Sequence, residues 1–318
     1  MYFPVAGIHA EPWVPPLVAF VVSFFMSMGG VSGAFLLLPF QMSFLGYVNP
    51  SVSATNQFYN VVAIPSGVYR YIREGRMVWP LTWVVIIGTL PGVLIGAFVR
   101  VTYLPDARDF KLFAACVLAY IALRMVRDLT KKKAGNGKAT AEEKFRSLVR
   151  THREKAASEG KNPDDLPAVC MNECCLSRIS YSFYGETYSF RTVGIFTLSF
   201  IVGIVGGVYG IGGGAIIAPF FVSFFGLPVY TVAGAALMGT FVTSVAGVTF
   251  YMAIAPLYPH MSVAPDWMLG LLLGIGGMAG MYLGARCQKH VPANLIKWML
   301  CCILLFTAGK YVVEFWSN

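Results

Sequence analysis

The sequence predicts an all-α polytopic membrane protein made of two inverted repeats, each a glycine-broken helix pair (re-entrant or split) followed by three transmembrane helices. Of its 318 residues, 57% are apolar and only 12% are charged, whereas soluble domains carry about 25% charged residues. Apolar runs of the length that a bilayer requires recur along the chain. A glycine-rich string followed by Pro-Phe also occurs twice.

The apolar runs are nearly free of charge and approach or exceed the roughly 20 residues that cross a bilayer. They cover residues 52–68, 79–99, 110–125, 232–255, 267–285 and 296–313. The first 16 residues contain no Lys or Arg, so we do not expect them to act as a signal peptide, which needs a basic start.

An internal repeat defines the organisation of the chain. Residues 20–71 align with residues 200–251 at a constant offset of 180, with 14 identities in 52 positions and no gap. The trio Gly92, Gly96 and Ala97 recurs in the second half at an offset of 188. We therefore predict a first transmembrane repeat over residues 1–127, an insertion over 128–190 and a second repeat over 191–318.

Each repeat begins with two short apolar arms on either side of its glycines. The arms cover residues 14–28 and 34–45 in the first repeat, and 193–208 and 215–225 in the second. An arm of 15 residues rises only about 22 Å, less than a hydrocarbon core of roughly 30 Å. We expect each pair to meet near the middle of the membrane, which leaves three crossings per repeat and makes the halves antiparallel.

The charges orient the chain. The net charge of +9 is carried by loops and is not interleaved with aromatic residues, so it predicts membrane orientation and no nucleic-acid partner. Lys and Arg near the ends of the runs number 13 on the side of the insertion and four on the other side. Cytoplasmic loops carry the excess of basic residues. The insertion is therefore expected in the cytoplasm and both termini outside the inner (plasma) membrane.

The broken segments predict a binding site for a small anion. The arms that follow the breaks would direct their N-termini, each with unpaired amides and about half a positive charge, at the membrane centre. Glycine lets an anion approach such a backbone closely. The candidate backbone residues are Gly30, Ser32, Gly33, Gly210, Gly212, Gly213 and Gly214.

Two other interpretations of these glycines stay open. The glycines could serve close helix packing alone, which we favour for Gly92 and Gly96 and for Gly280 and Gly284. A dinucleotide-binding fingerprint would need a strand before it and a βαβ unit around it, and membrane runs surround this string.

Polar residues follow the breaks, on the next apolar run of each repeat. We expect them to line the central cavity and to donate hydrogen bonds to substrate oxygens, with interhelical hydrogen bonding as the alternative. They are Asn56, Asn60, Thr240, Thr243 and Ser244.

The runs also lack ionisable groups at their centres. No Asp, Glu or His lies there, which argues against a proton-coupled antiporter, a cation site and an intramembrane hydrolase. An anion would then be held by backbone dipoles and neutral donors. We expect a transporter, not an enzyme, with no cofactor and no metal.

The paired strings closely resemble the sulfite exporter TauE/SafE family. They are Gly30-Val31-Ser32-Gly33 with Pro39-Phe40, and Gly210-Ile211-Gly212-Gly213-Gly214 with Pro219-Phe220. The resemblance implies an eight-span protein that moves sulfite, an organosulfonate or a related small oxoanion, and export is the direction we expect. The alternatives are a passive anion channel and a membrane sensor read out through the insertion. A homo-oligomer is left open.

The insertion has its own candidate residues. Residues 131–161 are expected to form a solvated, partly helical linker, and residues 181–190, rich in aromatics, to lie at the membrane interface. Cys170 and Cys174 would share a helix face, with Cys175 and His152 nearby. A metal or thiol-sensing role and an inert role both stay open, because zinc sites normally show a second ligand pair.

Overall fold

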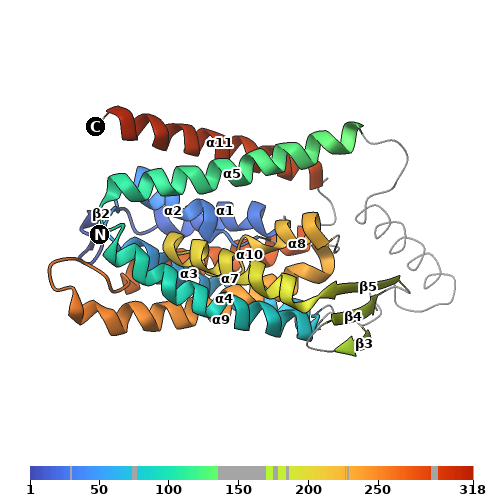
Figure 1. The fold of residues 1–318 in the computed structure, drawn as a ribbon. Helices are drawn as coiled ribbons and strands as arrows, with labels where there is room; N and C mark the ends of the chain where they lie inside the picture. The colour runs from blue at the N-terminus through green and yellow to red at the C-terminus, as the bar shows by residue number, and fades with distance from the viewer. Residues whose placement is uncertain are drawn as a thin grey trace.

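The computed structural model describes residues 1–28, 31–73, 77–134, 170–174, 178–183, 186–225, 227, 229–287 and 293–317, and these are mostly helical (Figure 1). The first half holds α1 (Val14–Met28), α2 (Ala34–Ser43), α3 (Ser51–Arg73), α4 (Trp79–Thr102) and α5 (Ala107–Ala134). The second holds α7 (Thr192–Tyr209), α8 (Ile217–Phe225), α9 (Val229–Ile254), the 3-10 turn η1 (Ala255–Leu257), α10 (Trp267–Cys287) and α11 (Ala293–Ser317).

Both glycine strings interrupt a helix, and three longer helices follow each interruption. The sequence placed the two arms of the first break at residues 14–28 and 34–45, and α1 and α2 occupy 14–28 and 34–43. In the second half, helix α8 begins at Ile217, two residues later than expected, because the glycines continue as turns. The prediction of a broken helix pair in each half is confirmed.

Within the described part of the chain, four helical stretches are long and apolar enough to cross a membrane: α4, α7, Val232–Leu257 and the α10 segment Trp267–Gly284. α1 and α2 are shorter apolar helices. The prediction that neither arm of a break could cross alone therefore fits the first half and is wrong for α7. That helix gains residues at both ends over the predicted 193–208.

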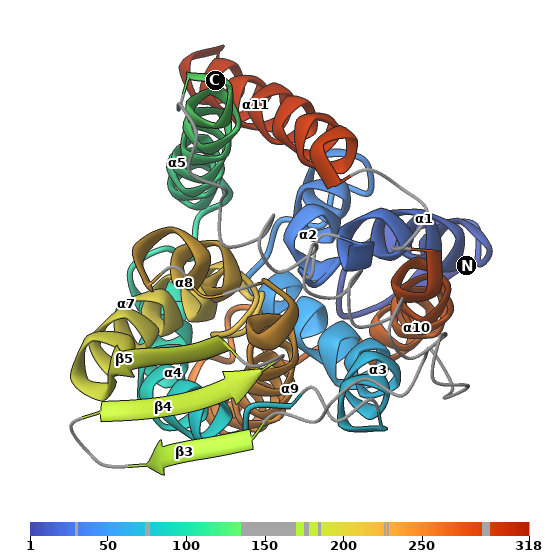
Figure 2. The same cartoon turned by 90° about the vertical axis from the view of Figure 1, so that its right-hand side faces the viewer.

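The helices of the two halves are interleaved. α4 packs along α7, and α1 packs along α10; among the described helices these two pairs make the most extensive contacts. α3 contacts α9 and α10, and α9 also contacts α4. α5 pairs with α11, and Figure 2 shows this pair to one side of the other helices.

Glycines allow α4 to pack closely on α7, and α10 to pack closely on α1. A Cβ atom added to Gly92 of α4 would lie 2.5 Å from the carbonyl oxygen of Phe200 in α7. Gly280 of α10 meets the carbonyl oxygen of Phe20 in α1 in the same way. Small residues let backbones approach like this in membrane bundles. The packing interpretation of the Gly92 and Gly280 pairs is confirmed.

The contacts at these glycines follow the internal repeat. Gly280 is the counterpart of Gly92 in the second half, and their partners Phe20 and Phe200 are also counterparts in the alignment of the two halves. Each half thus presents the first helix of its broken pair to the same helix of the other half.

Two small sheets accompany the helices, so the all-α prediction holds only for the bundle. β1 (Tyr2–Phe3) pairs with β2 (Ile8–His9), and β3 (Cys170–Cys174), β4 (Arg178–Phe183) and β5 (Glu186–Arg191) form an antiparallel sheet. The predicted helix face for Cys170 and Cys174 is wrong, because these residues lie on a strand. Within residues 181–190, strands β4 and β5 take up 181–183 and 186–190, where Tyr181 and Phe190 are buried.

Several expectations for the insertion lie outside the described residues, including Cys175, His152 and the part of 131–161 beyond Ala134. Among the residues that are described, no group of three or more His, Cys, Asp or Glu side chains could hold a metal ion. Both chain termini lie at one end of the molecule, opposite the sheet of β3, β4 and β5 (Figure 1).

Asp266 ties the N-terminal hairpin to the start of α10. Its carboxylate accepts hydrogen bonds from the amides of Ala6 (3.2 Å) and Leu269 (3.0 Å), and only 2% of the residue is exposed. Asp266→Ala removes a helix N-cap, so we expect the free energy of unfolding to fall by about 1–2 kcal/mol. Hydrogen exchange should show faster exchange of the Ile8 amide, and unchanged protection there would contradict this role.

Candidate functional site

The two breaks lie side by side, and side chains of α3 bridge them. Asn56 of α3 donates through Nδ2 to the carbonyl oxygen of Ala34 at 2.9 Å and to that of Gly210 at 3.1 Å. Ala34 opens α2, and Gly210 ends α7. One buried side chain therefore bridges the first break to the second.

Asn60, one turn further along α3, makes a second bridge. Its Oδ1 atom accepts a 2.6 Å hydrogen bond from the hydroxyl of Ser32 in the first break. Its Nδ2 atom donates to the carbonyl oxygen of Ile211 at 2.9 Å and to Ser244 Oγ at 3.3 Å. Asn60 and these partners are fully buried. Carbonyls freed by a helix break need such donors where no water is present.

The second break needs glycine for conformation and for space. Gly210 has φ of +77° and ends α7 in the left-handed conformation, which glycine adopts without steric cost. A Cβ atom at Gly210 would also lie 2.5 Å from Ser53 Cα. Gly212 has the same φ and would meet Ser244 Oγ at 2.7 Å.

The polar residues of α9 close the other side of this break. The amide of Gly213 donates to Thr243 Oγ1 at 3.0 Å, while the Thr243 hydroxyl donates to the carbonyl of Gly239 at 2.7 Å. A Cβ atom on Gly214 would collide with the carbonyl oxygen of Ala236. Thr240 lies beside it and donates to that same carbonyl. The glycine loop therefore packs tightly on α9.

The first break is held by contacts of Ser32 and Gly33. The amide of Ala34 donates to Ser32 Oγ at 3.3 Å, which satisfies one free amide at the start of α2. A Cβ atom on Gly33 would lie 2.6 Å from the hydroxyl oxygens of Ser23 and Tyr59. Gly30 lies outside the described residues.

The predicted polar residues thus gather as expected, but their hydrogen bonds go to the protein. Asn56, Asn60, Thr243 and Ser244 surround the paired breaks, and Thr240 lies beside Gly214. Their hydrogen-bond partners are backbone groups, hydroxyl groups and the side-chain amide of Gln41, which donates to Asn56 Oδ1 at 3.3 Å. Contact of these residues with a substrate stays a prediction, and the sequence did not reveal that break carbonyls would occupy the asparagine amides.

The comparisons with known proteins agree with the motif. The model of the sulfite exporter TauE/SafE family matches residues 16–311 of this chain. The chain belongs to that family. It is therefore a membrane transporter of the TauE/SafE family, as the paired strings predicted.

Two curated TauE/SafE-type relatives come from Bacillus subtilis strain 168. The chain is 22% identical to the "Probable membrane transporter protein YunE" over 297 residues, which cover 91% of this chain and 92% of the relative. It is 27% identical to the "Probable membrane transporter protein YdhB" over 115 residues, 36% of this chain and 43% of the relative. No solved structure matches the chain.

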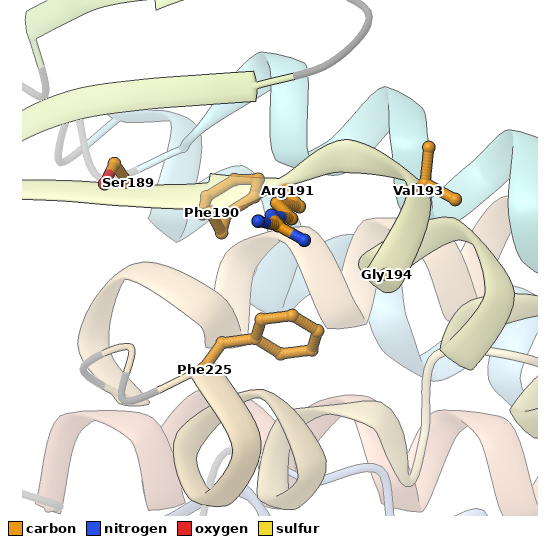
Figure 3. A pocket seen from close by; sticks show the side chains of 6 residues that line it. All are labelled: Ser189, Phe190, Arg191, Val193, Gly194 and Phe225. Carbon is orange, nitrogen blue, oxygen red and sulfur yellow. The ribbon is translucent and has the colours of Figure 1, made fainter.

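A pocket of about 720 Å³ opens in this TauE/SafE chain at the end that carries the sheet. It is lined by Ser189, Phe190, Arg191, Val193, Gly194 and Phe225. Figure 3 shows the Arg191 side chain and the Phe225 ring facing one another across it. Phe225 is the last residue of α8, and the first residue of α8, Ile217, follows the glycine break. α8 therefore runs between the pocket and the second break.

Sequence reasoning missed Arg100, because it counted this residue among the charges of an outer loop. Arg100 belongs to α4 and is 0% exposed. Its guanidinium carbon lies 3.8 Å from the centre of the Phe110 ring. That backbone dipoles and neutral donors hold the anion stays a prediction, and Arg100 is a buried cation that this prediction did not consider. The useful signal was the spacing of Arg100 from Gly96, which puts both on one face of α4.

Gln57 is a second polar residue that the sequence left without a role. It is 0% exposed, and neither atom of its side-chain amide has a hydrogen-bond partner among the described residues. Its amide packs on Gly247 of α9. A buried amide normally finds a partner, so Gln57 adds an available donor and acceptor between α3 and α9.

Proposed function

We propose that this TauE/SafE transporter exports a small sulfur oxoanion, such as sulfite or an organosulfonate, through the paired breaks. The observation that carries the proposal is the double bridge by Asn56 and Asn60. These side chains hold together two chain interruptions, one from each half of the chain. α2 begins at Ala34, whose carbonyl accepts from Asn56, and α8 begins at Ile217, after the bridged residues Gly210 and Ile211.

The hydrogen bonds of the asparagines favour an anion over a cation. They occupy the carbonyl oxygens of Ala34, Gly210 and Ile211, which are the negative ends of the broken backbone. At the starts of α2 and α8, the amides of Ala34 and Ile217 already donate to Ser32 Oγ and to the Gly214 carbonyl, so we assign the contact with a solute to the remaining first-turn amides. Such amides carry partial positive charge and bind oxygens of anions. We assign the contact with the substrate to Gly30, Ser32, Gly33, Gly210, Gly212, Gly213, Gly214, Asn56, Asn60, Thr240, Thr243 and Ser244.

Two inverted repeats around this site are part of the proposal. The reciprocal packing of the two halves supports it. Gly92 in the first half contacts Phe200 in the second, and their repeat counterparts Gly280 and Phe20 make the same contact in the opposite direction. A contact between α3 and α9 is also repeated between counterpart residues. Gln57 packs on Gly247, and Leu237, the counterpart of Gln57 in the second half, packs within 3.5 Å of a Cβ added to Gly67. Inverted repeats with broken helices at their interface are a common transporter design.

The pocket at Arg191 and Phe225 is the cytoplasmic entrance in this proposal. In this proposal that end of the molecule lies in the cytoplasm and the termini lie outside the inner membrane, because the insertion is basic and cytoplasmic loops carry the excess of Lys and Arg. The Arg191 side chain would attract an anion to the pocket, and α8 leads from there to the break. Transport then requires the buried contacts of Asn60 and Thr243 to open in turn.

Flux measurements in proteoliposomes test this function. We expect saturable uptake of sulfite or of a short alkylsulfonate, inhibited by the other, from a panel that also contains thiosulfate and sulfate. Flux that rises linearly with concentration would indicate the passive channel. The sensor alternative predicts that deletion of residues 134–165 abolishes function, whereas a transporter core should keep its flux. No flux of any anion in the panel would overturn the proposal.

A further inference from the structure

Arg100 is a buried cation whose hydrogen bonds are incomplete. It lies in the last turn of α4, and its Nη1 atom donates to the carbonyl oxygen of Leu104. Its Nε and Nη2 atoms are buried and have no hydrogen-bond partner among the described residues. A buried charge without a counterion costs several kcal/mol. A helix-capping role explains the hydrogen bond of Nη1, but it does not explain why Nε and Nη2 are buried without a partner.

The two unpartnered nitrogens form one binding edge. In the planar guanidinium group, Nε and Nη2 lie along one edge, so the N–H bond of Nε and one N–H bond of Nη2 point outward nearly in parallel. This edge matches two oxygens of a carboxylate, sulfonate or phosphate group at once. The opposite side of the group is already used, by the bond from Nη1 to Leu104. The free donors therefore have the geometry for one oxoanion.

Arg100 also lies next to the second break. Gly96, one turn earlier on α4, packs on the backbone of Gly207 and Val208 near the end of α7. The ring of Phe110, beneath the guanidinium, lies 6.4 Å from the ring of Tyr209, the last residue of α7. Tyr209 in turn donates to the carbonyl of Phe35 in α2 at 3.3 Å.

Among the described residues, no carboxylate pairs with Arg100. Tyr251 of α9 packs in one buried cluster with Ala97 and Val101, the neighbours of Arg100 on α4. No ion pair of Arg100 occurs among the described residues. α4 ends at the same end of the molecule as the chain termini (Figure 1).

We propose that Arg100 binds the transported oxoanion on the outer side of the paired breaks, through two hydrogen bonds from Nε and Nη2. This inference rests on the proposed function and adds a buried cationic residue to the transport path, in addition to Arg191 at the entrance. An anion that leaves the backbone amides of the break would meet this edge next. Lysine cannot replace the edge, because an ammonium group is a point charge without the planar pair of donors.

The test compares Arg100→Lys and Arg100→Gln with wild type and with Arg108→Gln. Arg108 is exposed, lies near the start of α5 and donates to the carbonyl of Phe315, so its variant removes the same charge outside the site. Two quantities are measured with sulfite and methanesulfonate: the apparent affinity in proteoliposome uptake, and the rise in thermal midpoint of the detergent-purified protein. A ligand that binds the folded state raises this midpoint.

We expect Arg100→Lys to weaken the apparent affinity about tenfold, since each charge-assisted hydrogen bond contributes strongly. Arg100→Gln should also lose the thermal shift, while Arg108→Gln behaves as wild type. Wild-type affinity in Arg100→Lys would overturn the inference, even if Arg100→Gln fails to fold. Stabilisation of wild type by anionic lipid alone would also overturn it. Failure of the proposed function differs, because wild type itself would then neither bind nor move an oxoanion.

Discussion

Asn60→Leu is expected to reduce the maximal rate of oxoanion flux at least tenfold and to lower the thermal midpoint. The substitution removes the acceptor of the Ser32 hydroxyl and the donor to the carbonyl of Ile211. Both groups are buried, and a buried polar group left without a partner costs about 1–3 kcal/mol. The two breaks would then lose one of their two asparagine bridges. Flux in proteoliposomes and thermal unfolding in detergent measure the two effects.

Asn60→Asp separates the role in transport from the role in folding. The aspartate keeps an oxygen that can accept from Ser32 Oγ, but it places a negative charge beside the amides that we expect to attract the anion. Its flux should therefore fall further than its thermal midpoint suggests. Flux of Asn60→Asp close to that of wild type would contradict an anion site at the breaks.

Asn49→Leu is the matched control for these variants. Asn49 also uses both ends of its amide: it donates to the carbonyl of Val5 at 3.3 Å and accepts from the hydroxyl of Ser51. It lies before α3, in the connection from α2 and away from the breaks. We expect Asn49→Leu to lose some stability and to keep its rate of transport. An equal loss of rate in both variants would attribute the effect of Asn60→Leu to general destabilisation.

The sequence was sufficient to predict the breaks because their signals are local. Glycines that interrupt an apolar run cannot continue a helix cheaply, and the same string at residues 30–46 and 210–226 made the pattern hard to miss. The positions of Asn56 and Asn60 on one face of α3 were also predictable, since residues four apart are neighbours on a helix. What they bind was not, because their partners Gly210 and Ile211 are distant in sequence.

The burial of Arg100 could not be predicted from hydropathy. A hydropathy profile ranks Arg100 as the end of a run, and it carries no information about which face of α4 meets another helix. The glycines that decide this, Gly92 and Gly96, were correctly assigned to packing, but the partner helix α7 was unknown. Once α7 is in place, the next residue on that face is Arg100.

The strands of the insertion had a signal that the sequence analysis did not use. In the stretch 178–183, Ile179 and Tyr181 alternate with Arg178, Ser180 and Ser182, a period of two that favours a half-buried strand. The aromatic content of residues 181–190 favoured a membrane interface, and that location stays a prediction. Ile179 and Tyr181 are buried where β4 lies between β3 and β5.

Gly92→Ala should cause the largest loss of stability for the smallest chemical change. A single added methyl group would lie 2.5 Å from the carbonyl oxygen of Phe200 and 2.8 Å from the amide nitrogen of Ile204. These are backbone atoms of a helix, so no side chain can rotate away, and α4 and α7 must separate. Overpacking of this kind costs about 1–3 kcal/mol. The thermal midpoint in detergent should fall by several degrees.

Gly309→Ala supplies the control for the change of residue itself. Gly309 lies in α11, and a Cβ atom added there has nothing within 4 Å. Alanine stabilises an open helical position by roughly 0.5–1 kcal/mol over glycine, so this midpoint should stay level or rise. Because α7 ends at the second break, separation of α4 from α7 should also reduce flux in Gly92→Ala. Equal midpoints in the two variants would show that the bundle tolerates a wider α4–α7 contact, and the glycines of α4 would then need another explanation.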